Sequence, residues 1–491
     1  MNADTLARSS RRHARASTAL ISLYVLGALP LSAYGFDIFG TNSAVTSTPA
    51  GIFADAGSGR PCLFGPVGTP LTLSEAVDRA LCGNPKTSQA WANVKVRAAA
   101  VGTAKSAYLP TLSASLQGGR DDTSTDVKNH PRLDSINRSN VYSTSVSANW
   151  VLYDFGGRKA GLDNAEALLA AAQAAQEALL QQMFSTVATD YYAAQSAAGK
   201  LAQAKIAEDL AHDSFTAASA RVSRGIAAIS DQLQTQTAWA QATFVRTEVE
   251  GEWLTALGTL ASDMNLNPDH AIQLPDGEDG NTPADDFTET VAAMIDNAQR
   301  THPSIAAAKA RLNAAMASER QTRAEGLPVF SLAGKYSQNN QPASLGLGEP
   351  QFPATGRDWY VGVQVQIPLF EGFGRIYRTS AARSQTELQT SILDEVRQQI
   401  GLDVWKSYQA LRTATQNSVN AATLVSVAAQ SFEAARHRYA AGVGNILELL
   451  TAQKTLSEAR QQRIHSLTEW RAARIHLASS LGRLNANDIR P

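Results

Sequence analysis

The sequence contains few cysteines, little charge and no long hydrophobic run. Two cysteines in 491 residues exclude a disulfide-dense scaffold and a four-cysteine zinc site. The charged fraction of 18% lies below the ~25% usual for soluble proteins, and the formal net charge of −1 argues against a nucleic-acid binder. Beyond residue 35, no segment reaches the ~18 consecutive apolar residues that predict a transmembrane helix.

The motifs of common enzyme classes are also missing. The sequence has no H-E-x-x-H, no P-loop, no G-x-S-x-G and no C-x-x-C. Its eight histidines are dispersed, without the spacing of metal ligands. Asp154-Phe155-Gly156 lacks the other kinase motifs, and we expect it to form a strand-to-helix corner. The sequence therefore predicts no catalytic activity, no cofactor and no metal site.

The N-terminus is typical of a secretory signal peptide over residues 1–35. Arginines precede an apolar run over 19–31, and Ala33-Tyr34-Gly35 provides a small-x-small cleavage site. A short N-terminal anchor is the alternative. No cysteine directly follows the apolar run, so a lipoprotein signal is not visible. In an oxidising compartment, Cys62 and Cys82 either form a disulfide or remain unpaired, and the sequence leaves both possibilities open.

The chain repeats itself at an offset of 217 or 218 residues. Asn84-Pro85 matches His302-Pro303 at 218, and Leu152-Tyr153-Asp154 matches Leu369-Phe370-Glu371 at 217. Further pairs at 217 are Tyr191 with Tyr408, Phe215 with Phe432, Arg221 with Arg438, Gly225 with Gly442, Asp231 with Glu448, Gln236 with Gln453 and Trp253 with Trp470. Such a long match with one single-residue shift indicates an internal duplication.

The duplication sets the expected domain organisation. We expect repeats over 71–267 and 287–484, joined by a linker over 268–286 that is rich in proline, glycine and acidic residues. An N-terminal extension over 36–70 and a C-terminal tail over 485–491 complete the chain. Each repeat predicts a helix, a β-hairpin, a long helix, a turn and a returning helix.

The expected bounds follow from proline, glycine and hydrophobic periodicity. In the first repeat we expect a helix over 72–108, a β-hairpin over 111–152 with a polar loop over 121–140, a long helix over 156–224 and a returning helix over 229–264. In the second repeat we expect the same elements over 288–326, 329–369 with a polar loop over 339–357, 373–441 and 445–483.

The long helices carry a coiled-coil pattern. In the first, Leu162, Leu169, Gln176 and Met183 recur every seven residues, with alanines interleaved. At about 1.5 Å per residue, such a helix spans roughly 100 Å, far more than a compact domain.

The strands have one apolar and one polar face. Trp359, Val361 and Val363, for example, alternate with Tyr360 and Gly362. A sheet that faces lipid must close into a barrel, and bacterial barrels have an even strand number of about eight or more. One chain supplies four strands, so two chains would give eight and three would give twelve. A soluble β-sandwich with serine-rich exposed faces is the alternative.

Three segments together with the duplication closely resemble the TolC-like outer membrane factor family, over residues 71–484. They are Leu73-Ser74-Glu75-Ala76 with Asn84-Pro85, Ile367-Pro368-Leu369-Phe370-Glu371-Gly372 and Arg438-Tyr439-Ala440-Ala441-Gly442-Val443. The resemblance implies an α+β membrane protein: a homotrimer with a 12-stranded β-barrel in outer-membrane lipid, continued by an α-helical tunnel into the periplasm. It also implies a passive duct that docks with a periplasmic adaptor protein and an inner-membrane ABC or proton-driven transporter.

The resemblance also assigns residues to the tunnel entrance. It places adaptor-contacting turn residues at Arg224, Gly225, Arg438, Tyr439, Gly442 and Val443, and an acidic ring at Asp231 and Glu448. Without the resemblance, each glycine simply ends a helix, each acid suits a helix start, and Tyr439 packs between helices. Gly444 and Thr451 replace an arginine and an acid of the family's best-known pattern, so the same gating lock is not expected.

The resemblance favours type I protein secretion as the function, because the N-terminus carries no lipoprotein signal. Small-molecule efflux is the alternative within the family. An exported coiled-coil scaffold without a pore is the alternative from another class.

Overall fold

The computed structural model describes residues 37–50, 62, 64–275, 290–340 and 355–484. The expected signal peptide, most of the linker and the C-terminal tail lie outside the described residues. The chain divides into two units, Met1–Ala44 and Val45–Pro491. The described part of the first unit holds a short 3-10 helix, η1 (Thr41–Ala44), next to Asp37, whose carboxylate accepts hydrogen bonds from Thr41 and Asn42. All the later helices and strands belong to the second unit.

Each repeat begins with two short helices, and the prediction of one continuous helix is wrong. The pairs are α3 (Leu73–Gly83) with α4 (Pro85–Ser106), and α7 (Val291–Thr301) with α8 (Pro303–Ala324). The helices break because proline forces the preceding residue out of the helical region. Asn84 and His302 accordingly have extended backbones, with ψ of 133° and 132°.

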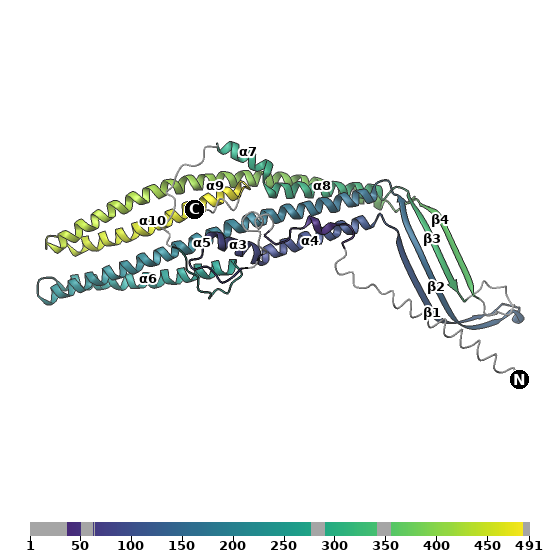
Figure 1. Cartoon of the computed structure of the whole chain (residues 1–491), viewed down its shortest axis with the longest axis horizontal. Coiled ribbons are helices and arrows are strands. Elements are labelled where there is room, and N and C mark those ends of the chain that lie inside the picture. The colour runs from purple at the N-terminus through teal and green to yellow at the C-terminus, as the bar shows by residue number, and fades with distance from the viewer. Residues whose placement is uncertain (1–36, 51–61, 63, 276–289, 341–354, 485–491) are drawn as a thin grey trace, which may run out of the picture. The chain divides into compact units, whose positions relative to one another are not determined.

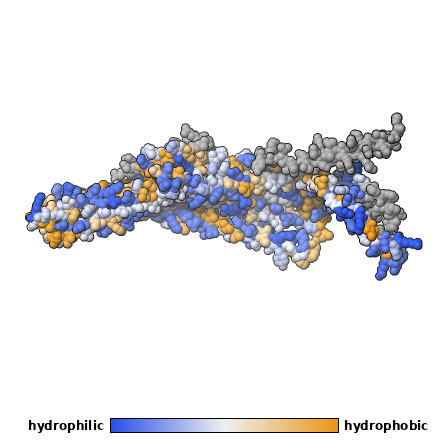
Figure 2. Space-filling model, turned by 90° about the horizontal axis from the view of Figure 1, so that it is seen from below, coloured by the Kyte–Doolittle hydropathy of each residue, from blue (hydrophilic) through white to orange (hydrophobic). Residues whose placement is uncertain are grey.

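Four antiparallel strands form one sheet in the order β1-β2-β3-β4. They are β1 (Thr111–Thr125), β2 (Ser135–Tyr153), β3 (Val329–Asn339) and β4 (Gly356–Gln366). The expected loop over 121–140 is too long, because β1 and β2 stay paired from Arg120↔Asn140 to Thr125↔Ser135 and only residues 126–134 connect them. Polar residues on both faces hide this extension from a periodicity argument. The same end of the β1–β2 hairpin is hydrophilic in Figure 2, at the far right.

The long and returning helices occur as predicted, to within a few residues at each end. Helices α5 (Gly157–Ser223) and α9 (Gly374–Ala440) have 67 residues each, and α6 (Ile229–Asp263) and α10 (Ile446–Ser480) have 35 each. Their start positions differ by 217 residues. Helix α6 runs back along α5, and α10 runs back along α9 (Figure 1). Among the described residues, no helix is long and apolar enough to cross a membrane.

Among the described residues, buried clusters lie around the middle of the long helices and also near the turn between α9 and α10, where Phe432 and Leu449 are buried. One buried cluster joins α3, α5 and the end of α6 through residues such as Leu81, Phe184 and Leu260. A second cluster joins α7, α9 and α10 and includes Val404 and Trp470. The short helices α3 and α7 therefore pack against the middle of α5 and α9.

Arginines fix the two corners where a strand passes into a long helix. At the first, the Arg158 guanidinium donates to the carbonyls of Val151 (2.6 Å) and Leu152 (3.1 Å), and Asp154 accepts from the Arg158 backbone N–H (2.6 Å). At the second, Arg375 donates to Pro368 O at 3.1 Å. As predicted, Asp154-Phe155-Gly156 forms a strand-to-helix corner.

Candidate functional site at the helical turns

The turn between α5 and α6 is closed by a left-handed glycine. Gly225 has φ of 71°, and its N–H donates to Val222 O at 2.9 Å. The N–H of Ile226 donates to Arg221 O at 3.0 Å, which satisfies a carbonyl of the last helical turn. Arg224 is the C-cap residue of α5, and it is exposed.

The turn between α9 and α10 is also closed by a left-handed glycine, and it has two further features. Gly442 has φ of 77°, and Arg438 O accepts from the N–H groups of Val443 (3.1 Å) and Gly444 (3.0 Å). A Cβ atom at Gly444 would lie only 2.8 Å from Tyr439 N, so any side chain there would displace backbone. Asn445 then caps α10 by accepting from Leu447 N–H at 3.0 Å.

The two turns are joined by an arginine and a tyrosine from different repeats. The Arg221 guanidinium lies 4.8 Å from the centre of the Tyr439 ring and donates to Tyr439 O at 3.3 Å. The Tyr439 hydroxyl is buried and has no hydrogen-bond partner among the described residues. This cation–π contact links the ends of α5 and α9.

The two predicted acidic residues lie in equivalent places but have different neighbours. Asp231 and Glu448 occupy the first turns of α6 and α10. Glu448 accepts from Arg438 at 2.9 Å, whereas Asp231 accepts a long hydrogen bond from Ser230 at 3.4 Å. Within the described residues, no salt bridge reaches Asp231. The duplicated arginines therefore act differently, because Arg221 turns to Tyr439 and Arg438 turns to the acid of its own repeat.

Exposed apolar side chains surround both turns, and of these only Val443 was expected from the sequence. They are Ile226, Ile229 and Leu233 beside the first turn, and Val443 and Leu447 beside the second. Single exposed apolar residues are common, but a group at the end of two helical hairpins is typical of a contact surface. Arg221 was also missed as a site residue, although its match to Arg438 was visible in the repeat.

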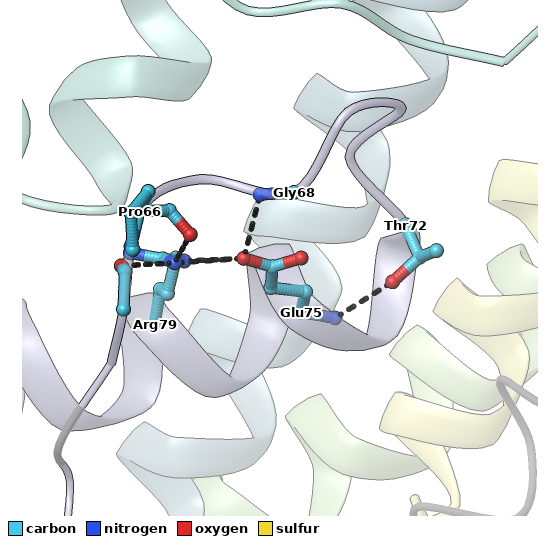
Figure 3. Close-up of polar contacts among 6 residues, drawn as sticks. Pro66, Gly68, Thr72, Glu75 and Arg79 are labelled. Atoms are coloured by element: carbon cyan, nitrogen blue, oxygen red, sulfur yellow. Dashed lines mark hydrogen bonds and ion pairs between the residues drawn. The ribbon is translucent and has the colours of Figure 1, made fainter.

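A clamp holds the segment before α3 against that helix (Figure 3). Glu75 accepts from Gly68 N–H at 3.1 Å and forms a salt bridge with Arg79 at 2.7 Å. Arg79 also donates to the carbonyls of Gly65 (2.8 Å) and Pro66 (2.9 Å).

A disulfide reinforces the clamp. Cys62 and Cys82 are bonded in the structure, with an S–S distance of 2.06 Å. This bond ties the segment before the clamp to the end of α3.

Known proteins match the chain over both repeats. The family model described as outer membrane efflux protein matches residues 76–265 and 294–483. Protein CyaE of Bordetella pertussis is 31% identical over 420 residues, which cover 85% of this chain and 85% of that protein. Outer membrane efflux protein BepC of Brucella suis is 23% identical and covers 87% of this chain and 89% of that protein.

Solved structures show the same fold. The outer membrane protein VceC from Vibrio cholerae has a TM-score of 0.70 at 16% identity, covering 84% of this chain and 96% of that chain. The CmeC outer membrane channel from Campylobacter jejuni has a TM-score of 0.73 at 16% identity, covering 84% and 86%. The two matches to one family model, one in each repeat, establish that the chain belongs to the outer membrane efflux protein family. Members of this family are channels of the outer membrane that extend into the periplasm, and they are not enzymes.

Proposed function

We propose that three copies of this chain form an exit duct, with a 12-stranded barrel in the outer membrane and a helical tunnel in the periplasm. The observation that carries this proposal is the open sheet. Among the described residues, β1 and β4 each pair on one side only. An unpaired strand edge cannot remain exposed within a bilayer, so the sheet has to close with other copies.

The faces of the sheet support closure in lipid. Aligned rows such as Ala114–Val146–Tyr336–Trp359 give one apolar face. The opposite face is polar, with Ser113 bonded to Ser147 at 2.7 Å. This alternation suits a barrel with lipid outside and water inside.

The duplication predicts how neighbouring copies pair. The register of β1 with β2, in which Thr111 lies opposite Asn149, recurs in β3 and β4 as Val329 opposite Gln366. The pairing of β2 with β3 is then a template for β4 with β1 of the next copy. Ser147 of β2 lies opposite Lys335 of β3. Their counterparts in the other repeat are Gln364 of β4 and Gln117 of β1, so we expect Gln364 to lie opposite Gln117 of the neighbouring copy.

The long helices fit the same arrangement. On α5, Ser185 is 6% exposed and bonds His476 of α10. Its counterpart on α9, Leu402, is 45% exposed. By the repeat, we expect Leu402 to pack against α6 of the next copy, where Leu254, Gly258 and neighbouring residues line a shallow groove. Helix α9 thus offers to a second copy the face that α5 buries within the chain.

A cross-linking experiment tests this register. With Gln117→Cys and Gln364→Cys in one chain, mild oxidation of outer membranes is expected to give covalent dimers and trimers, because directly opposed Cα atoms lie within disulfide range. The control is Leu116→Cys with Gln364→Cys, whose side chains point to opposite faces. Monomers alone, or equal cross-linking of both pairs, would overturn the register.

Type I protein secretion, with a periplasmic adaptor and an inner-membrane transporter, is the transport process that we propose for this duct. The identity of 31% to CyaE exceeds the 23% to BepC, so the relative whose name describes an efflux protein is the weaker match of the two. Small-molecule efflux is the second candidate, favoured by the BepC match. Deleting the gene is expected to remove a large protein from the culture medium and leave drug susceptibility unchanged. The opposite outcome would select efflux.

Asp231 and Glu448 would form rings of acids at the entrance of this trimer, where carboxylates bind cations. We expect Asp231→Asn to weaken block by divalent cations in planar bilayers more than Glu448→Gln, because Arg438 already pairs with Glu448. The control is Glu252→Gln, at an exposed acid about 30 Å further along α6. Unchanged block in Asp231→Asn would remove this residue from the entrance, and a silent purified trimer would leave only a closed duct.

A further inference from the structure

Two equivalent joints connect the end of a returning helix to the start of a short helix. At the first, Asn84 accepts from Lys86 N–H at 2.9 Å and donates to Asp263 O, at the end of α6, at 3.0 Å. At the second, His302 Nδ1 accepts from Ser304 N–H at 3.1 Å, and the ring hydrogen-bonds the backbone of Ser479 near the end of α10.

The histidine ring can make both contacts only while it is neutral. Accepting on Nδ1 leaves the single proton on Nε2 for the Ser479 carbonyl. A second proton on Nδ1 would remove the acceptor and place a positive charge at the N-terminus of α8, where the helix dipole disfavours it. The Asn84 side chain at the first joint does not titrate, so it has no protonated form that would remove its acceptor.

The surroundings of His302 favour the neutral ring. The side chain is buried, and this burial lowers its pKa below the ordinary 6.5, against the Ser479 hydrogen bond and Asp403, which act in the other direction. A cavity of 730 Å³ beside the joint is lined by further charged or titratable groups: Arg311 of α8, Asp403 and Lys406 of α9, and His476 of α10. Neutral Gln181 and Gln182 face it from α5.

We propose that His302 makes the α10–α8 joint of the second repeat sensitive to protons, so that acidification uncouples α8 from the end of α10 while the Asn84 cap persists. A group with a lowered folded-state pKa takes up its proton in the unfolded chain first. The joint is therefore strongest above the ordinary pKa near 6.5 and weakens as the pH falls below it. Close packing supports the coupling, since a Cβ atom at Gly482 would lie 3.1 Å from His302 Cδ2.

Hydrogen exchange in the purified full-length protein tests the proposal. Between pH 7.5 and 5.5, after correction for intrinsic exchange, we expect protection of the Ser304 amide to fall about tenfold, the size expected for losing a helix cap. Protection of the Lys86 amide, its equivalent at the first joint, should not fall, because Asn84 does not titrate. Burial raises the pKa of the neighbouring Asp263 to about 7, so acidification favours the folded state at that joint. This comparison needs no variant and no transport activity, so it is independent of the proposed secretion function.

Two variants identify the responsible group. His302→Asn, which copies the first joint, should keep the Ser304 amide protected at both pH values. His476→Gln should leave the pH dependence as in the wild type, because His476 bonds Ser185 and Thr189 and not the α8 cap. Equal loss at Lys86 and Ser304, or an unchanged pH response in His302→Asn, would overturn the proposal.

Discussion

Val363→Lys will prevent the chain from assembling in the outer membrane, whereas Gln364→Lys will leave assembly intact. These neighbours point to opposite faces of β4. Val363 lies opposite Leu332 on the apolar face, and Gln364 lies opposite Ser331 on the polar face. A lysine on the lipid face of a barrel costs about 2–4 kcal/mol near the bilayer midplane, and a trimer would carry it three times.

Membrane fractionation followed by a gel that preserves trimers measures this effect. The expected result is loss of trimer for Val363→Lys and a wild-type amount for Gln364→Lys, with altered conductance. Because the same side chain is introduced at adjacent positions, a general effect of lysine on β-propensity cancels. Equal loss of trimer for both variants would contradict the assignment of the two faces.

The second large effect is expected at the clamp before α3. In Arg79→Ala, Glu75 loses its salt bridge and the carbonyls of Gly65 and Pro66 lose their donor. The Arg79 side chain is only 9% exposed, so we expect a loss of about 2–3 kcal/mol in stability. The segment around Gly65 and Pro66 should also become more sensitive to protease, because its carbonyls lose Arg79 while Gly68 keeps its hydrogen bond to Glu75.

Arg300→Ala is the matched control for the clamp. Arg300 pairs with Asp296 at the same spacing of four residues, but its side chain is 69% exposed. Exposed pairs of this kind contribute about 0.3–0.5 kcal/mol. Thermal unfolding of the detergent-purified protein should therefore change clearly for Arg79→Ala and little for Arg300→Ala. Similar shifts in both variants would show that the clamp adds nothing beyond an ordinary surface pair.

The long helices were predictable because local signals mark both ends. Gly225 and Gly442 end α5 and α9, and the repeat gives each boundary twice. The breaks at Asn84 and His302 were missed although the prolines were seen, because the matching Asn-Pro and His-Pro pairs were interpreted as motifs of the repeat and the family and not as helix ends. The outer part of the β1–β2 hairpin was missed because it lacks the alternation that a half-buried strand requires.

The turn residues were predictable only one by one. The sequence places Gly225, Gly442, Asp231 and Glu448 at helix ends, where the structure has them. It does not pair Arg221 with Tyr439, because this contact depends on how two repeats pack, 218 residues apart in the chain. For the same reason the different partners of Arg221 and Arg438 were not foreseen.

The equal lengths of the helices limit how the gene can change. Helices α5 and α9 match in length, and so do α6 and α10. A seven-residue insertion would preserve the heptad pattern of α5, yet it would carry one turn about 10 Å beyond the other. That displacement would separate Arg221 from Tyr439. A viable change in tunnel length therefore requires matched insertions in all four helices. We expect the length of these helices to change much more rarely in evolution than their amino-acid sequence.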